Sequence, residues 1–325
     1  MPCDQRLDLL RSLLSQAEIS GGVAHMEPVV DQGSTNRMSL VETDQGKRFI
    51  FREYRWPHDG RELDRVRKEP FLHERLRQHG IPAPQVLAAT HYGPWGAVLL
   101  EYLPGELLGE VTPRLEPDAR DQAWSSAGQV MRRIHSITYP TGTAGVILGE
   151  DLRPFEQGSW GRFCGRDLVR HAARLQEHRP DLRIDLGRLR SLADTIESVL
   201  DEAPAVLLHN DPHPWNVLVQ EAEDGWECSG WLDWEYAWVG DPVWDLVRMD
   251  MFRRKPIGPT PMALWDGYGA IPPEPRRVFY ELQISLWMAN EYLDGSRALP
   301  PTHRAAISYI EDLEAHLAHI EQVFG

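Results

Sequence analysis

Apolar residues recur along the chain at two spacings, and each spacing predicts a different kind of element. Spacings of three and four residues predict helices at 7–17, 61–79, 124–135, 189–199 and 310–324. Short apolar runs bounded by turn residues predict strands at 27–30, 38–41, 48–52, 97–103, 206–208, 217–219 and 231–233. An Asp224-Gly225 turn is predicted to join the last two strands into a hairpin, and the proline-rich stretch 256–275 is predicted to be a loop.

The predicted strands gather in the first hundred residues, whereas helical periodicity dominates the rest of the chain. Pro104-Gly105 stops the strand at 97–103, which places the change near residue 104. A length of 325 residues also fits two lobes. The sequence therefore predicts an α+β fold with a small mixed N-terminal lobe, residues 1–103, and a larger, mainly helical lobe, residues 104–325.

The composition of the chain narrows the classes of molecule that the protein could bind. The 34 Lys and Arg residues against 49 Asp and Glu residues give a net charge of -15, and such an acidic chain is poorly suited to binding nucleic acid. No stretch approaches the roughly 20 apolar residues that span a bilayer, and the three cysteines form no CxxC pair. We therefore expect a cytoplasmic protein without a membrane segment, zinc cage or disulfide scaffold. The sequence carries no signal for an oligomeric state.

Charge is distributed unevenly along the chain. Residues 201–250 contain twelve acids and one base, Arg248, whereas residues 37–77 contain eleven bases and eight acids. A run of acids is usually a solvated face. The alternative is that these acids surround a bound cation, and the sequence leaves both interpretations open.

The candidate chemistry lies in the segment between the strands at 206–208 and 217–219. It runs His209-Asn210-Asp211-Pro212-His213-Pro214-Trp215-Asn216, and Asp233 follows seventeen residues after Asn216. Phosphoryl transfer from ATP needs a carboxylate that accepts the proton of the attacking hydroxyl, and hard oxygen ligands that hold Mg²⁺. An Asp followed five residues later by an Asn has the spacing of the protein-kinase catalytic loop. Asp211 is therefore the candidate base, and Asn216 and Asp233 are the candidate Mg²⁺ ligands.

Three blocks in order resemble the aminoglycoside phosphotransferase family, whose pattern is H-G-D-x-H-x-x-N, then I-D-W-E, then G-D-P-x-x-D-L. Here the blocks are His209-x-Asp211-x-His213-x-x-Asn216, Leu232-Asp233-Trp234-Glu235 and Gly240-Asp241-Pro242-x-x-Asp245-Leu246. The resemblance spans residues 25–250 and implies a protein-kinase-like two-lobed fold. It also implies transfer of a phosphoryl group from ATP or GTP, with Mg²⁺, to a hydroxyl of a small molecule. We expect structural capping roles for Asp241 and Asp245.

The resemblance assigns further candidate residues. Nucleotide contacts are expected from Gly33 and Ser34 of a phosphate-covering loop, from the pair Arg52 and Glu69, and from the hinge residues Glu101 and Leu103. Candidate acceptor contacts come from position in the sequence instead: Glu281, Asn290, Glu291 and Asp294 lie on a helix predicted after the loop 256–275. Glu235, two residues after Asp233, is either a further acceptor contact or an acid that supports the site from behind. The implied acceptor is an aminoglycoside or another antibiotic, and a cationic acceptor would also suit the acidic catalytic segment.

Three departures separate the chain from the family pattern. Asn210 stands where the family has glycine, Arg52 stands where it has the strand lysine, and the phosphate-covering loop has one glycine, Gly33. Arginine keeps the charge of lysine but is bulkier and forked.

Other functions remain open from the sequence. The same scaffold resembles kinases of choline, homoserine and sugars, so a metabolic kinase is the first alternative. A nucleotide-binding module without catalysis is the second. In the third, His209, His213 and Asp233 bind a metal for hydrolysis, although that function gives Asn216 and the later blocks no role. We expect His209 to be structural, bonded to loop carbonyls or a neighbouring carboxylate.

Overall fold

A computed structural model describes residues 3–29, 36–54, 64–154, 158–182, 184–251, 259–293 and 310–319. The chain divides into two compact units. Unit 1 contains residues 1–133, 147–153 and 215–235, and unit 2 contains residues 134–146, 154–214 and 236–325. These packing units do not test the lobes predicted at 1–103 and 104–325, the first to bind the nucleotide and the second to carry the catalytic and substrate-binding residues, so the lobe boundary stays a prediction.

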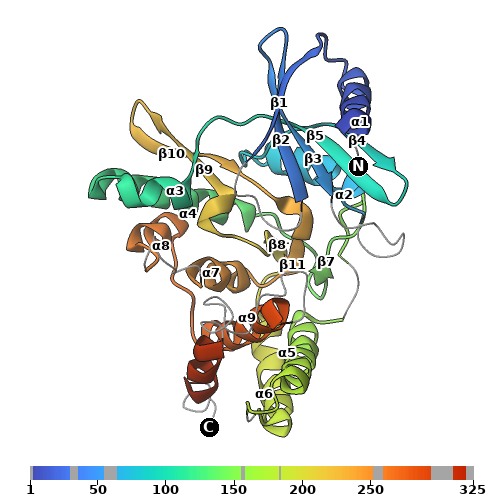
Figure 1. Ribbon diagram of the computed structural model, residues 1–325. Helices are drawn as coiled ribbons and strands as arrows, with labels where there is room; N and C mark the ends of the chain where they lie inside the picture. The colour runs from blue at the N-terminus through green and yellow to red at the C-terminus, as the bar shows by residue number, and fades with distance from the viewer. Residues whose placement is uncertain are drawn as a thin grey trace. The chain divides into compact units, whose positions relative to one another are not determined.

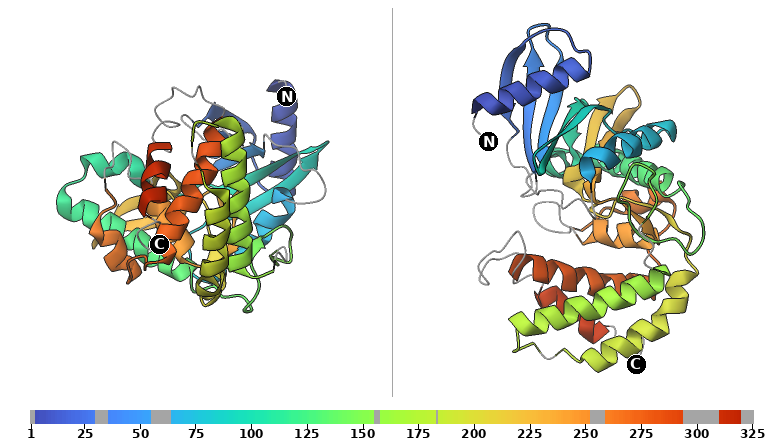
Figure 2. Two further views of the ribbon diagram at one scale, coloured as in Figure 1. Left: turned by 90° about the horizontal axis from the view of Figure 1, so that it is seen from below. Right: turned by 90° about the vertical axis from the view of Figure 1, so that its right-hand side faces the viewer.

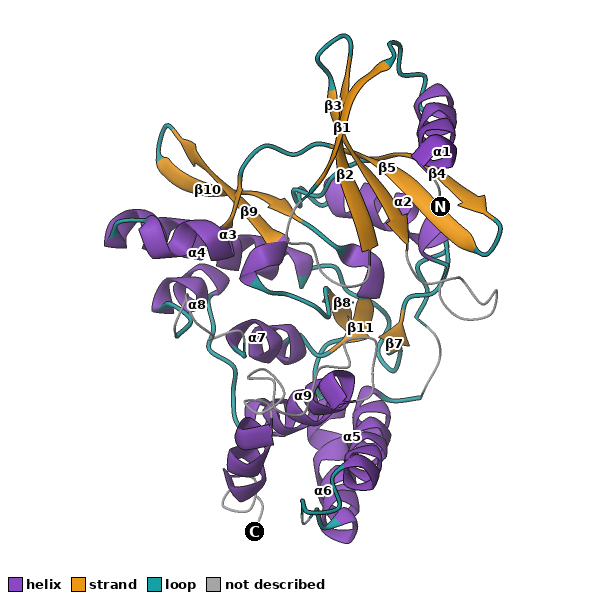
Figure 3. Ribbon diagram, in the orientation of Figure 1, coloured by secondary structure: helices purple, strands orange, loops and turns teal. Residues whose placement is uncertain are grey.

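The first part of unit 1 is a sheet with helices packed against it (Figures 1 and 3). Its strands are β1 (Val23–Pro28), β2 (Asn36–Thr43), β3 (Arg48–Tyr54), β4 (Val86–Tyr92) and β5 (Trp95–Glu101). They are all antiparallel, in the order β1-β2-β3-β5-β4. The helices are α1 (Cys3–Gln16) and α2 (Arg65–Gln78).

The period of two along a strand sends alternate side chains to opposite faces of this sheet. Phe49 and Phe51 of β3 join the apolar cluster that α1 completes with Leu10 and Leu13. The intervening residues, Ile50 and Tyr54 among them, join a smaller cluster with Val66 of α2. The structure confirms the helix predicted at 7–17 and the strands predicted at 38–41 and 48–52. The strand predicted at 27–30 begins earlier and ends at Pro28, and Val30 lies outside the described residues.

The rest of unit 1 is helical with a second small sheet. The elements are β6 (Glu106–Leu107), α3 (Leu108–Val111), α4 (Pro117–Ile134), β9 (Val217–Ala222) and β10 (Gly225–Trp231). Strands β9 and β10 form the predicted hairpin, with a register shift near Gly230. The strand predicted at 97–103 begins earlier and ends at Glu101.

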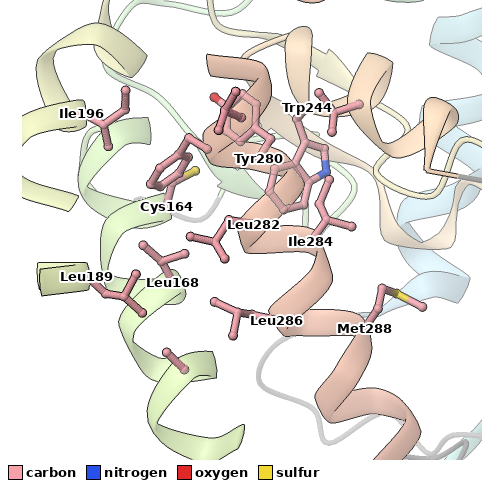
Figure 4. Close-up of a cluster of buried hydrophobic side chains, with 14 of the residues drawn as sticks. Cys164, Leu168, Leu189, Ile196, Trp244, Tyr280, Leu282, Ile284, Leu286 and Met288 are labelled. Carbon is pink, nitrogen blue, oxygen red and sulfur yellow. The ribbon is translucent and has the colours of Figure 1, made fainter. Parts of the chain in front are cut away.

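Unit 2 is built mainly of helices around an apolar core. Its elements are β7 (Gly145–Val146), α5 (Trp160–His178), α6 (Leu186–Asp201), β8 (Val206–Leu208), β11 (Trp238–Gly240), α7 (Val243–Asp250), α8 (Met262–Tyr268) and α9 (Arg276–Leu293). Helices α5 and α6 lie side by side (Figure 2). Figure 4 shows Leu168 of α5, Ile196 of α6 and Leu282 of α9 in the shared core. Burial of these side chains from water is the main force that holds the three helices together.

The proline-rich stretch 256–275 of unit 2 contains a helix, α8, where the sequence predicts a loop. Pro261 precedes the first turn of this helix and Gly269 ends it with a left-handed φ of 89°, so the residues that suggested a loop are terminators of a helix. The predicted C-terminal helix is confirmed over 310–319, and its remainder lies outside the described residues. Among the described residues, no helix is both long and apolar enough to cross a bilayer.

Candidate functional site

Arg52 lies in the middle of β3, on the face of the sheet that packs against α2. Its neighbours in register are Met38 of β2 and Val98 of β5. One Nη of Arg52 forms an ion pair with Glu69 of α2, and the other donates to Asp233 Oδ1 at 3.2 Å. The structure thus brings the two residues of the expected pair into contact and adds a second carboxylate to it.

Burial differs sharply within this Arg52 cluster (Arg52, Glu69 and Asp233). The side chains of Arg52 and Glu69 are 2% and 0% exposed, whereas that of Asp233 is 30% exposed. Burial acts to lower the pKa of Arg52, but the neighbouring Tyr54, Asp233 and Glu235 raise it above its ordinary value. The two carboxylate partners offset the free-energy cost of burying the guanidinium. Of these two partners, Asp233 is the one that remains accessible to solvent.

Asp233 follows β10 in a conformation that no strand could hold. The strand predicted at 231–233 ends at Trp231, and Asp233 has a φ of +63°. A positive φ reverses the chain direction and is uncommon for residues other than glycine. The prediction of strand at Leu232 and Asp233 was therefore wrong, because the chain turns sharply at the proposed metal ligand.

Asn216 lies beside this turn. It ends a short 3-10 helix, Pro214–Asn216, immediately before β9, and its backbone carbonyl accepts a hydrogen bond of 2.8 Å from the N–H of Leu232. Its neighbour Trp215 packs against α3, where a Cβ on Gly109 would lie 2.6 Å from the indole ring. Asn216 and Asp233 are therefore brought together within unit 1 by the hairpin and by this backbone bond.

Glu235 is enclosed by cations. It is 0% exposed; Arg65 Nε lies 2.7 Å from Oε2, and Asn36 Nδ2 donates to Oε1 at 3.1 Å. The ammonium of Lys68 donates to the backbone carbonyl of Glu235 at 2.5 Å. Burial raises the pKa of Glu235 to about 7 and lowers the pKa of Lys68 to about 7. These contacts join the first turn of α2 to the segment that follows Asp233.

The loop that carries Asp211 belongs to unit 2, where α7 holds its backbone. The N–H groups of His209 and Asn210 donate to the two carboxylate oxygens of Asp245, at 2.7 and 2.9 Å. His135 approaches the same carboxylate at 3.2 Å. Asp245 is 1% exposed; its role is structural, but it holds this loop and does not cap α7, in which it lies. Asp241 accepts from the N–H of Val243, the first residue of α7, through its Oδ1.

His209 and Asn210 shape the loop from within. His209 is 0% exposed, and its Nδ1 accepts from the N–H of Asp211 at 3.3 Å, so it is structural, bonded to a loop amide. Asn210 has a φ of +68°, which explains why glycine is common at this point of the family pattern. Asparagine tolerates the left-handed region better than most residues, and its Oδ1 accepts a hydrogen bond of 2.8 Å from Trp244 Nε1. The departure from the family pattern therefore preserves the turn.

Asp211 is paired with a residue that the motif does not contain. Arg248 of α7 donates to Asp211 Oδ1 at 2.8 Å, and the two side chains are 3% and 18% exposed. His213 Nε2 lies 3.7 Å from Oδ2. This partner was not predicted from the sequence, although two signals pointed to it: Arg248 is the single base among residues 201–250, and it follows Asp245 by three residues, on the same face of a helix.

The other nucleotide candidates have simpler surroundings. The side chain of Glu101, at the end of β5, accepts from Arg77 at 2.8 Å and from the N–H of Gln85 at 3.1 Å, and Leu103 is partly buried beyond the strand. Gly33 and Ser34 lie outside the described residues.

The acceptor candidates of α9 belong to the interior of unit 2. Glu281 is 3% exposed, forms an ion pair with Arg277 and lies 3.6 Å from His316 Nδ1. Asn290 is 1% exposed, and its amide donates to the carbonyl oxygens of His171 and Leu286, both at 2.9 Å. Glu291 is partly buried and Asp294 lies outside the described residues. The fold itself accounts for Glu281, Asn290 and the enclosed Glu235, and their contact with an acceptor stays a prediction.

A metal site of the histidine and carboxylate type has no support in the described part of the chain. Within those ranges, no three or more His, Cys, Asp or Glu side chains are grouped so that they could hold an ion. A site made of Asn216 and Asp233 is of another type, because one of its ligands is an amide oxygen.

The sequence matches the phosphotransferase enzyme family over residues 28–279. No protein with a curated description matches it. Among solved structures it is similar to APH(2″)-IIa in complex with gentamicin, with 16% identity, 94% of this chain and 95% of that chain covered, and a TM-score of 0.63. It is also similar to the aminoglycoside phosphotransferase APH(2″)-Ib with bound ADP, with 17% identity, 95% and 96% covered, and a TM-score of 0.60.

A third similar structure is a candidate fructosamine-3-kinase from Thermobifida fusca YX-ER1, with 18% identity, 96% and 99% covered, and a TM-score of 0.60. Identities this low show the fold alone. They confirm the α+β, protein-kinase-like class that the motif blocks predicted.

Proposed function

The chain belongs to the phosphotransferase enzyme family, and from this premise we propose that it transfers the γ-phosphoryl group of ATP or GTP, bound with Mg²⁺, to a hydroxyl of a small molecule. The observation that carries the proposal is the Arg52 cluster, in which one buried arginine joins Glu69 of α2 to Asp233. Kinases use a cation paired with a helix glutamate to hold the phosphates, and an aspartate to hold the metal.

Each motif residue has a role in this proposal. Asp211 orients the acceptor hydroxyl and accepts its proton. Asn216 and Asp233 hold Mg²⁺, and the donors fit this ion because both are hard oxygens, one carboxylate and one amide, from neighbouring turns of unit 1. The ion, when bound, neutralises charge on the transferring phosphoryl group.

The nucleotide is proposed to bind chiefly through unit 1. Arg52 faces the phosphates, together with backbone N–H groups of the loop that contains Gly33 and Ser34, and the adenine or guanine base meets the backbone at Glu101 and Leu103. One similar structure is described as bound to ADP and another as a complex with GDP, which supports a nucleotide donor of either kind. A donor of this kind also suits the cytoplasm, where we propose that the enzyme works.

The first acceptor class to test is the aminoglycosides. Similar structures are described as complexes with gentamicin, kanamycin and streptomycin, and the acidic segment 201–250 would suit a cationic acceptor. On this proposal the enzyme would modify an antibiotic.

A second acceptor class is favoured by a specific observation: acids of the catalytic segment already have cationic partners. Asp211 is paired with Arg248, Asp233 with Arg52 and Glu235 with Arg65, while Asp241 is paired with Arg276. A carboxylate neutralised in this way attracts an ammonium group less strongly. Uncharged alcohols such as sugars therefore belong in the same test, as do choline and homoserine.

The experiment is a screen for nucleotide-dependent phosphorylation. The purified chain is incubated with ATP or GTP, with and without Mg²⁺, against aminoglycosides and the smaller alcohols, and the release of ADP or GDP and the mass of the acceptor are measured. We expect one acceptor class to gain the mass of a phosphoryl group, and only with Mg²⁺. Nucleotide binding without any transfer would support the non-catalytic alternative, and product formed from an ester without nucleotide would support hydrolysis.

A further inference from the structure

Helix α7 carries three side chains that reach the same short loop. Trp244 donates to the side chain of Asn210, Asp245 accepts from the backbone of His209 and Asn210, and Arg248 donates to the carboxylate of Asp211. Asp245 and Arg248 are three residues apart, so they lie on one face of the helix. A single helix thus fixes the backbone of the loop at one point and the side chain of Asp211 at another.

Arg248 is held in place by more than its ion pair. Its side chain is 3% exposed, and its guanidinium lies 5.3 Å from the centre of the Trp287 ring of α9, within the range of a cation–π contact. A buried guanidinium has few alternative conformations and is costly to leave without a carboxylate. The contact with Asp211 is therefore a property of the packed helices α7 and α9.

Arg248 binds the carboxylate of Asp211 at Oδ1, and His213 Nε2 lies 3.7 Å from Oδ2. An ion pair at Oδ1 restricts rotation about the Cβ–Cγ bond and so determines the direction of Oδ2. The side chain of Asp211 remains 18% exposed.

We propose that Arg248 is a positioning residue for Asp211: by binding Oδ1 it directs Oδ2 toward the acceptor hydroxyl. The inference rests on the proposed function. In the reaction the hydroxyl proton moves to Oδ2 while the hydroxyl oxygen bonds to the γ-phosphorus, and the bond from that phosphorus to the β–γ bridging oxygen breaks, so that the nucleoside diphosphate leaves. Arg248 touches none of the reacting atoms.

The test compares three variants of the full chain: Arg248→Met, Arg248→Lys and, as matched control, Arg276→Met. Methionine keeps an apolar stem beside Trp287 but removes the ion pair, and lysine keeps the charge without the fork. Arg276 lies in the same unit and pairs with Asp241, not with Asp211. The measured quantities are kcat, the KM values for ATP and for the acceptor with the highest turnover in the screen, and the unfolding temperature.

We expect Arg248→Met to lower kcat by about 10- to 100-fold, the usual effect of a misplaced catalytic group, with the KM for ATP within about twofold. Arg248→Lys should recover part of this loss. Arg276→Met should keep kcat within about threefold, whatever its effect on the unfolding temperature. A purely structural role would instead give Arg248→Met and Arg276→Met the same kcat at a given loss of stability.

Failure of this inference and failure of the proposed function would give different results. If the wild type transfers phosphate but Arg248→Met keeps its kcat, or Arg248→Lys is no better than Arg248→Met, the inference is overturned and the proposed function stands. If the wild type transfers no phosphate to any acceptor, the proposed function is overturned and the inference falls with it. If Arg248→Met does not fold, the comparison of Arg248→Lys with the wild type decides, because loss of the fork alone is then expected to lower kcat with unchanged KM for ATP.

Discussion

Both units hold a candidate functional carboxylate by means of a buried arginine, but they do so in different ways. In unit 1, Arg52 is 2% exposed and its partner Asp233 is 30% exposed; in unit 2, Arg248 is 3% exposed and its partner Asp211 is 18% exposed. In both pairs the cation is buried and the acid remains accessible. A carboxylate arranged in this way keeps a defined orientation while it can still meet a ligand.

The two arginines differ in the contacts that accompany each pair. Arg52 contacts two carboxylates, those of Asp233 and of the fully buried Glu69. Arg248 contacts the carboxylate of Asp211 and lies beside the Trp287 ring. We infer that Glu69 would still hold Arg52 if Asp233 turned toward a metal ion.

The largest expected effect comes from removing the acid of unit 2. Asp211→Asn cannot accept the hydroxyl proton, so kcat should fall by on the order of 10²–10⁴-fold, with little change in affinity for ATP. Steady-state kinetics and ATP titration check this outcome. Asp224→Asn, in the exposed β9–β10 turn, is the matched control and should keep full activity; a comparable loss in both variants would remove Asp211 from the role of base.

The second test removes Glu69, the buried carboxylate that would still hold Arg52 without Asp233. Glu69→Gln removes the buried one of the two carboxylates that Arg52 contacts, and breaking a buried pair from one side costs about 3–5 kcal/mol of folding stability. Denaturant unfolding measures the loss, and ATP titration should show weaker binding because Arg52 is no longer held. Arg77→Met, which breaks a half-exposed pair with Glu101, should cost only about 0–1 kcal/mol. Equal losses would show that Arg52 does not need Glu69.

The third test uses pH to probe the carboxyl beside the Arg52 cluster. Burial raises the pKa of Glu235 from 4.5 to about 7, so between these values the folded chain holds a proton that the unfolded chain has lost. Its contribution to stability is complete below pH 4.5 and disappears as pH rises through 7. The stability of the wild type relative to Glu235→Gln should therefore fall by about 1–3 kcal/mol from pH 5 to pH 8.

Lys68→Met provides the control for this titration. Burial lowers the pKa of Lys68 from 10.5 to about 7, so the unfolded chain binds more protons than the folded chain between these values. The wild type should therefore gain stability relative to Lys68→Met as pH rises above 7. Chemical denaturation across pH 5–10 measures both variants, and a flat difference for Glu235→Gln between pH 5 and 8 would contradict the burial argument.

The smallest effect is expected at the turn beside Asp211. Asn210→Gly relieves a left-handed φ but loses the hydrogen bond to Trp244, so stability should change by no more than about 1 kcal/mol. Asn210→Ala keeps the strained φ and loses the bond, and should cost about 2 kcal/mol. Thermal unfolding separates the two. An alanine variant as stable as the glycine variant would mean that the turn is not set by residue 210.

Much of the fold could be predicted because its signals are local. Apolar spacing predicted α1, α4 and α6 and the strands β1 to β3, and the Asp224-Gly225 turn predicted the β9–β10 hairpin. The errors include whole elements, since neither α5 nor β4 was predicted, as well as the ends of others. Proline in 256–275 concealed α8, and an apolar run that continues past Trp231 concealed the turn at Asp233. The positive φ of Asp233 is determined by the tertiary packing around it, so the local sequence pattern does not predict it.

By itself, the sequence determined the order and spacing of Asp211, Asn216 and Asp233 and the family, because each depends on neighbours within a few positions or on a motif. Only the tertiary structure decided which charges meet: Arg52 with Asp233, 181 residues away, and Arg248 with Asp211, 37 residues away. Ion pairs between residues this far apart in the sequence form when folding buries the cation beside one or two carboxylates. A count of acids along the chain cannot distinguish those already neutralised from those available to a ligand.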